Sequence, residues 1–255
     1  MSLVLTPVPP FPGLNNWAQL MSFRPPTVIQ GGVNARFGVS RACHAIEDGK
    51  CPINLDFYPV RVSAMPTGTM AAKDLLENVR RMLNLFVDHM PDGCVFNPYD
   101  PLVDQASWAP PFIQFGFPGA VLSIDMVTGR LNPDDGSVLL SEWTEDHWIF
   151  STLWTPNDFN HPVSGNRQFG YFPTVAGEFI FYTRAADRVT TWVDELLAEQ
   201  VFSGGHKIWL SFQRRLSAFV NDNGGMAVIE PAVSNRYDWA TVQASYFQPT
   251  VPWAV

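Results

Sequence analysis

A polar segment at residues 161–171 carries the side chains of this sequence that are best suited to chemistry. It holds a histidine, a serine, an arginine and two glycines. Aromatic, strand-like stretches flank it on both sides, at residues 148–154 and 178–184. Polar groups placed between aromatic strands indicate the rim of a binding or catalytic site, although the segment matches no catalytic signature.

Asp158, His161 and Ser164 allow one catalytic interpretation, a hydrolase whose serine nucleophile is activated by a histidine base and an acidic residue. All three fall within seven consecutive residues, whereas triad members normally come from separate elements that fix each one independently. The chain also contains no Gly-x-Ser-x-Gly elbow. Two other interpretations stay open: residues 164–166 form a tight turn while His161 and Arg167 tie the loop to the sheet, or these two side chains face a ligand.

A second cluster, at residues 182–188, lies where a predicted strand passes into a predicted helix. It is either a buried Arg–Asp network or an anion-binding pocket, because a guanidinium group matches the geometry of carboxylate and phosphate groups. Arg167 and Arg184 are predicted to converge on one pocket with His161, which then holds a carboxylate, a phosphate-like group or the Asp187 side chain. The expected ligand contacts are His161, Arg167, Tyr182, Arg184 and Asp187.

A third polar stretch joins Glu142, Glu145 and Asp146 to His147. Carboxylates beside a histidine suit acid–base work, and the same residues suit a solvated hairpin turn. The sequence has no Walker loop, no Gly-x-Gly-x-x-Gly after a strand, no His-Glu-x-x-His and no calcium loop. The absence of these motifs makes nucleotide-dependent and metal-dependent functions less strongly supported, and we expect no cofactor.

Composition narrows the class of partner. The formal net charge is −8 and Lys plus Arg number only 16, so a broad nucleic-acid footprint is not expected. Hydrophobic residues make up 46% of the chain, which includes 9 Trp and 19 Phe. This composition favours an apolar cavity, an exposed apolar interaction surface or an ordinary hydrophobic core. No run of eighteen apolar residues is present, so no membrane-spanning helix is expected.

The three cysteines, Cys43, Cys51 and Cys94, are predicted to be reduced thiols of a cytoplasmic protein. The N-terminus lacks the basic and apolar regions of a signal peptide, which agrees with that compartment. A Cys43–Cys51 bridge stays open for a chain exported without a cleaved signal. A metal site that combines these thiols with His44 is not expected, because no CxxC spacing is present.

The elements that position these residues are predicted from periodicity. The proline-rich residues 1–50 are expected to form an irregular arm, packed through aromatic residues such as Trp17. A strand at 55–64, with Pro59 at an edge or bulge, precedes a helix at 69–90 with one apolar face. Residues 91–120 are expected to form a long aromatic loop that acts as a lid, a pocket wall or plain packing.

Short connections between successive strands predict an antiparallel meander. Its strands are expected at 120–128, 137–143, 148–154, 168–172 and 178–185. A helix from Thr190 to Ser203, a second helix at 205–220 and a short strand at 226–229 are expected to follow. The fold class is therefore α+β, an antiparallel sheet packed against two or three helices with long aromatic and Pro-rich loops. One domain is expected, with a core at 55–230 and an irregular aromatic tail at 231–255.

This order of elements, from residue 55 to 221, resembles the helix-grip plan of START-like lipid-binding proteins and polyketide-cyclase-like proteins. The resemblance implies a sheet that wraps around a long helix, here 205–220, and encloses an apolar cavity. No motif maps residue by residue, so the resemblance assigns no catalytic residue.

Three functions follow from the sequence. The first is binding of a hydrophobic or aromatic small molecule, with or without an anionic group, and with a cofactor-free, non-redox transformation left open. The second is an interaction protein, such as a secreted effector, an immunity partner or an oligomer subunit, that uses exposed aromatics of the arm and tail. The third is the hydrolase built on the His161 segment. Whether the protein is an enzyme and whether it forms a homo-oligomer are not decided.

Overall fold

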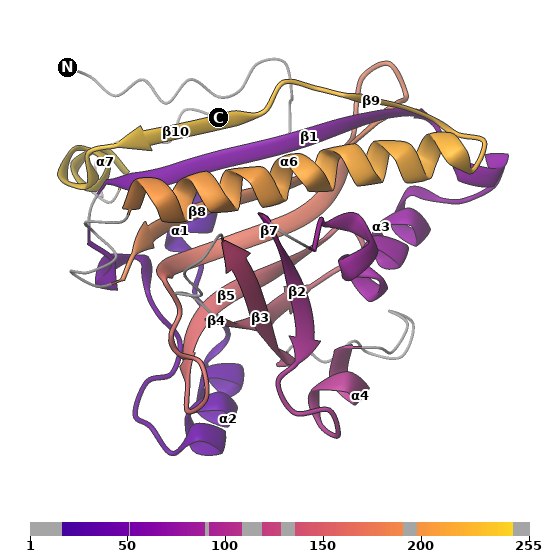
Figure 1. Cartoon of the computed structure of the whole chain (residues 1–255). Helices are drawn as coiled ribbons and strands as arrows, with labels where there is room; N and C mark the ends of the chain where they lie inside the picture. Colours follow the sequence, from indigo (N-terminus) through magenta and orange to yellow (C-terminus); the bar gives the residue numbers. More distant parts are fainter. Residues whose placement is uncertain are drawn as a thin grey trace.

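One antiparallel sheet organises the chain, as the computed structural model shows for residues 17–50, 52–89, 92–108, 119–128, 136–190 and 198–246 (Figure 1). The strand order is β10-β1-β8-β7-β5-β4-β3-β2, with β9 beside β1 and β6 beside β5. The strands are β1 (Ile53–Ala64), β2 (Asp92–Pro98), β3 (Val121–Thr128), β4 (Gly136–Trp143), β5 (His147–Thr155), β6 (Phe159–Asn160), β7 (Val163–Pro173), β8 (Phe179–Val189), β9 (Met226–Ile229) and β10 (Val233–Tyr237). The predicted meander is confirmed.

Helices cover both faces of this sheet. They are α1 (Trp17–Ser22), α2 (Thr27–Phe37), α3 (Ala72–Arg81), α4 (Asp104–Trp108), α6 (Ala198–Asp222) and α7 (Trp239–Tyr246), with short 3₁₀ turns η1 (Ile46–Asp48), η2 (Pro66–Gly68) and η3 (Leu83–Phe86). The helix predicted at 69–90 is shorter than expected. It ends at Arg81 because Met82 leaves the helical region (φ −117°, ψ 35°) before η3 begins.

The long helix α6 runs along β1 (Figure 1) and packs on the concave face of the sheet. Its buried side chains include Ile208, Phe212 and Leu216, which join one core with Phe169 of β7 and Phe181 of β8. A meander that grips a long C-terminal helix is the helix-grip arrangement, so the architecture expected from element order is confirmed.

The break expected at Gly204–Gly205 does not occur, because α6 is continuous from Ala198 to Asp222. Each helical glycine costs about 1 kcal/mol relative to alanine. Burial of the apolar face of α6 outweighs that cost. The preceding helix was expected to begin at Thr190, which is not helical and instead bonds to the carbonyl groups of His161 and Pro162; residues 191–197 lie outside the described residues.

Pro59 lies inside the sheet at a point where it interrupts no pairing. The outer neighbour of β1 is β10 up to Phe57 and β9 from Val60 onward. A proline lacks the N–H needed for a ladder hydrogen bond, so the gap between these two neighbours accommodates it. Pro59 is therefore at neither a sheet edge nor a bulge, because β1 has neighbours on both sides and its register shift lies between Val62 and Ala64.

The N-terminal arm is not irregular where it is described. Trp17, Leu20 and Met21 of α1 are buried against the convex face of the sheet. Ile29 and Val33 of α2 cover the convex face near β3, β4 and β5. Apolar residues spaced by three and four positions make one helix face, a pattern that the flanking prolines obscure.

The tail is also more regular than expected, since it forms β10 and α7. Tyr237 and Trp239 pack against the same convex core as α1. The interaction-protein alternative depended on exposed aromatics in the arm and tail, and Trp17, Tyr237 and Trp239 are not exposed in this way. Phe23 is also packed in part against this core, whereas Phe11 and Trp253 lie outside the described residues.

Residues 91–120 are only partly loop. Residues 92–98 form β2, which pairs in register with β3 from Asp92↔Thr128 to Pro98↔Leu122. The prolines after Asn97 hid this strand from a composition-based prediction. Residues 109–118, where a lid was considered, lie outside the described residues.

Candidate ligand-binding site

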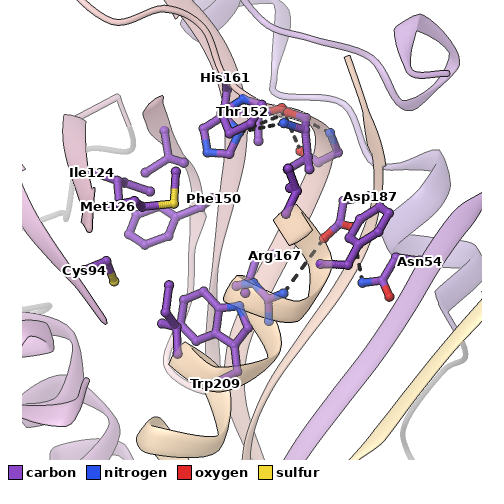
Figure 2. Close-up of a pocket in the computed structure, with 18 of the residues that line it drawn as sticks. Asn54, Cys94, Ile124, Met126, Phe150, Thr152, His161, Arg167, Asp187 and Trp209 are labelled. Atoms are coloured by element: carbon purple, nitrogen blue, oxygen red, sulfur yellow. Dashed lines mark hydrogen bonds and ion pairs between the residues drawn. The ribbon is translucent and has the colours of Figure 1, made fainter. Parts of the chain in front are cut away.

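A cavity of about 120 Å³ lies between the N-terminal half of α6 and the concave face of the sheet (Figure 2). One wall is apolar and comes from β2, β3, β4 and β5, with Phe96, Ile124, Met126, Val138 and Phe150. The facing wall is polar and comes from β1, β7 and β8. Such a mixture of apolar walls and a few polar groups is typical of small-molecule sites.

A glycine lines the cavity on each side, Gly165 on the sheet and Gly205 on α6. Gly165 of β7 lies beside Asp187 in the sheet register, and its N–H donates a hydrogen bond to Thr152 Oγ1 at 3.0 Å. A Cβ at Gly165 would approach the Ala186 carbonyl oxygen to 2.2 Å, so no other residue fits this close contact of strands. Gly205 lines the opposite side, and a Cβ there would meet nothing nearer than Trp209 Nε1 at 4.0 Å.

Arg167 organises the polar wall. Its Nη2 atom lies 2.7 Å from Asp56 Oδ2 and 3.9 Å from Asp187 Oδ2. The guanidinium also lies over the Trp209 ring, 4.1 Å from its centroid. Asn54 Nδ2 donates to both carboxylates, at 3.2 Å to Asp56 and 3.3 Å to Asp187. Figure 2 shows Arg167 and Asn54 directed toward Asp187 from opposite sides.

The pKa of the Asp187 carboxyl group is strongly shifted. Burial raises its pKa from 3.8 to about 7, and the negative charge of Asp56 adds to the rise, while Arg167 and Asn54 oppose it. A buried carboxyl near pH 7 exists in both protonation states under neutral conditions. Such a group is suited to donating or accepting a proton.

His161 lies at the other end of the cavity, next to Thr152 (Figure 2). Burial lowers the pKa of His161 to about 3, so its ring is neutral at physiological pH. The Val163 N–H donates to His161 Nδ1 at 3.1 Å. Gly136 leaves room for the ring, since a Cβ at that position would lie 2.5 Å from His161 Cδ2.

The triad considered for a hydrolase is not assembled. The carboxylate of Asp158 accepts hydrogen bonds from Ser123 (2.5 Å) and Ser137. Ser164 Oγ is buried without a hydrogen-bond partner in the described part of the chain. The strand expected at 168–172 begins earlier, at Val163, so residues 163–167 belong to β7 instead of the expected loop. The alternation along a strand directs Ser164 to the face opposite Arg167.

The predicted site residues divide into two groups. His161, Arg167 and Asp187 line the cavity, whereas Tyr182 and Arg184 do not. Tyr182 packs in the convex core, and its hydroxyl donates to Gln168 Oε1 at 3.0 Å, as does Arg184 Nε at 2.8 Å.

The predicted convergence of Arg167 and Arg184 is therefore wrong. The strand β8 continues to Val189 instead of ending at residue 185. The period of two in a strand places Thr183 and Asp187 on one face and Arg184 on the other. That period was visible in the sequence.

Several lining residues were not predicted, namely Asn54, Asp56, Thr152, Gly205, His206 and Trp209. One signal was available, because Asn54 and Asp56 are polar at alternate positions of the first half of β1, where Ile53, Leu55 and Phe57 are apolar. Tyr58 continues this series, and its hydroxyl lies 2.8 Å from His206 Nδ1. The proximity of α6 to these positions is a tertiary feature that no local pattern shows.

The acidic stretch with His147 is a hairpin turn away from the cavity. His147 lies 2.7 Å from Glu142 through Nε2 and 2.8 Å from Asp146 through Nδ1. Burial disfavours the charged ring, but the hydrogen bonds to Glu142 and Asp146 outweigh it and raise the pKa of His147. These contacts connect the strands β4 and β5.

Cys43 and Cys94 are free, buried thiols. Cys94 lines the apolar wall of the cavity, and burial raises its pKa to about 12. Cys51 lies outside the described residues. Among the described residues, no helix has the length and hydropathy needed to cross a bilayer.

Comparisons with known proteins give a likeness of fold only. No protein-family model matches the chain, and no curated protein matches it. The solved structures with a similar fold include the following three. The di-domain ARO/CYC StfQ from the steffimycin biosynthetic pathway is 14% identical with a TM-score of 0.39; the match covers 69% of this chain but only 52% of StfQ. Truncated norcoclaurine synthase from Thalictrum flavum is 13% identical with a TM-score of 0.41, covering 67% and 96%. Ara h 8.0201 is 9% identical with a TM-score of 0.34, covering 66% and 99%. Scores of this size carry no argument about function.

Proposed function

We propose that this chain binds a small, mainly apolar molecule in the cavity between α6 and the concave face of the sheet. The observation that carries the proposal is an apolar cavity closed on one side by Asp56, Arg167 and Asp187. Apolar walls supply affinity, and a few fixed polar groups set the orientation of the ligand.

The energetics of the cavity favour an occupant. A ligand that removes apolar surface of the cavity wall from water gains about 25 cal/mol for each Å². The polar wall carries the free-energy cost of burying ionisable groups that an apolar core would not need. A ligand that hydrogen-bonds to this wall recovers part of that cost.

The test is a titration of the purified chain with benzyl alcohol, followed by calorimetry, in the wild type and in Gly205→Leu. Gly205 lines the cavity and has open space at its Cβ position, so a leucine there occupies the ligand volume. Ser203→Leu is the matched control, because Ser203 is an exposed residue of the same helix. We expect binding in the wild type and in the control, and its loss in Gly205→Leu. Equal binding in all three proteins would refute the proposed site.

A cofactor-free transformation of the bound molecule is a second candidate, favoured by the position of Asp187. This carboxyl lines the cavity and has a pKa of about 7, which suits general acid–base catalysis at neutral pH. Exchange of the α-protons of a small aryl ketone with D₂O, followed by ¹H NMR, measures such proton transfer directly. The proposal requires faster exchange with the wild type than with Asp187→Asn, and equal rates would remove it.

A further inference from the structure

The polar wall of the cavity carries more negative charge than positive charge. Asp56 and Asp187 share the single guanidinium of Arg167, which is 2.7 Å from Asp56 but 3.9 Å from Asp187. Arg236, the other cation near Asp187, is paired with Glu199 and lies over the Phe202 ring at 4.8 Å. Asp187 is thus the carboxylate with the weaker compensation.

Unpaired acceptors in the same wall point in the same direction. Asp56 Oδ1 and Asn54 Oδ1 are buried without a hydrogen-bond partner in the described part of the chain. Both side chains are more than nine-tenths buried, with 3% and 4% exposure, and both residues line the cavity. A buried polar group left without a partner costs about 1–3 kcal/mol. The polar wall therefore lacks a hydrogen-bond donor, and a positively charged donor balances its negative charge.

We infer that the cavity selects a small apolar molecule that carries a protonated amine, with the ammonium group held by Asp187 and Asp56. The inference rests on the proposed function and names its ligand class. An ammonium group brings a positive charge and three donors to acceptors that lack them. A carboxylate or phosphate group, as expected from the sequence, instead meets two acidic side chains whose only close guanidinium, within the described residues, is already bonded.

The size of the cavity limits the apolar part of this ligand. An apolar cavity of about 150 Å³ holds one benzene molecule, and this cavity measures about 120 Å³. The apolar wall with Phe150 and Ile124 faces the polar wall across this space (Figure 2). The apolar part of the ligand is therefore limited to about one ring, and a one-carbon arm places its amine toward the polar wall.

The experiment compares three probes with the same ring, namely benzylamine, benzyl alcohol and benzoate. Each is titrated calorimetrically at about pH 8, above the pKa of about 7 of Asp187. We expect benzylamine to bind at least tenfold more tightly than benzyl alcohol, and benzoate to bind most weakly. Tenfold corresponds to about 1.4 kcal/mol.

Two variants locate the preference. Asp187→Asn removes the charge at the site, and we expect the ratio of benzylamine to benzyl alcohol affinity to fall to within about threefold while benzyl alcohol still binds. Asp222→Asn, at the exposed end of α6, removes the same formal charge elsewhere and is expected to keep the preference.

Four results overturn the inference. An amine that binds no better than the alcohol, or a preference that survives in Asp187→Asn, removes the ammonium site but leaves the proposed function intact. Benzoate as the tightest probe shows that Arg167 selects anions instead. If none of the three probes binds, the proposed function itself fails and the inference fails with it.

Discussion

Replacing Asp187 by asparagine should stabilise this protein in a manner that depends on pH. Burial raises the pKa of Asp187 to about 7 in the folded state. In the unfolded chain its pKa returns to the ordinary value near 3.8. The folded state therefore holds the proton more tightly, so the stability linked to Asp187 is fully present below about pH 4 and is lost as the pH rises to about 7.

The magnitude follows from the two pKa values. They differ by about 3, and one pKa unit corresponds to about 1.4 kcal/mol, so the free energy of unfolding attributed to Asp187 falls by about 4 kcal/mol between pH 4 and pH 8. Asparagine resembles the protonated carboxyl in shape and carries no charge. Asp187→Asn should match the wild type at pH 4 and exceed it by up to about 4 kcal/mol at pH 8, or by roughly 10 °C in melting temperature.

The assay is urea unfolding of the wild type and Asp187→Asn at four pH values between 4 and 8. Taking the difference between the two proteins at each pH removes the contributions of the other titrating groups. Asp222→Asn serves as the exposed control, with a difference near zero throughout. A difference that does not change with pH, or a variant that is less stable than the wild type at pH 8, would show that the Asp187 carboxylate is a stabilising ion-pair partner and would refute this account.

Three further substitutions test the packing and the charge network by denaturant unfolding. Arg167→Ala should lower the free energy of unfolding by about 3–5 kcal/mol, because it leaves the buried Asp56 without its guanidinium partner. The control is the exposed Arg41→Ala, with an expected loss below about 1 kcal/mol. An equally small loss for Arg167→Ala would contradict the charge network. Leu83→Ala should cost about 2–5 kcal/mol because the side chain is buried, and a loss below about half a kcal/mol would place it at the surface. Asp104→Ala should cost about 3 kcal/mol or more, since the carboxylate is bonded to Arg36 and to two backbone N–H groups; retention of full stability would show that α2 is held in place by other contacts.

Some sequence expectations stay predictions. The cytoplasmic location, a homo-oligomer and the single-domain organisation are of this kind. The reduced state of Cys43 and Cys94 agrees with their burial as free thiols. A melting temperature that does not change on addition of reductant would extend this conclusion to Cys51.

The sequence itself determined the elements whose signal is local. The consecutive strand-like stretches at 120–185 with short connections predict the meander, and the apolar stripe with Ile208, Phe212 and Leu216 predicts the gripping helix. These patterns depend only on neighbours along the chain, because a strand repeats every two residues and a helix every 3.6. Prolines around 25 and 98 interrupted the same patterns and hid α2 and β2.

The tertiary structure decided which of the polar side chains meet. Arg167 contacts Asp56, which is 111 residues earlier in the chain, because the early strand β1 pairs with β8, beside β7, in the sheet. Periodicity puts Arg184 on the opposite face of β8 from Asp187, but only the packing shows that the Arg184 face, shared with Tyr182, is the convex one, away from the cavity. The charge balance of the site, and with it the preference for an amine, depends on these long-range contacts. Local periodicity can assign a residue to a face of a strand, but only strand order and the packing of α6 bring two faces together around one cavity.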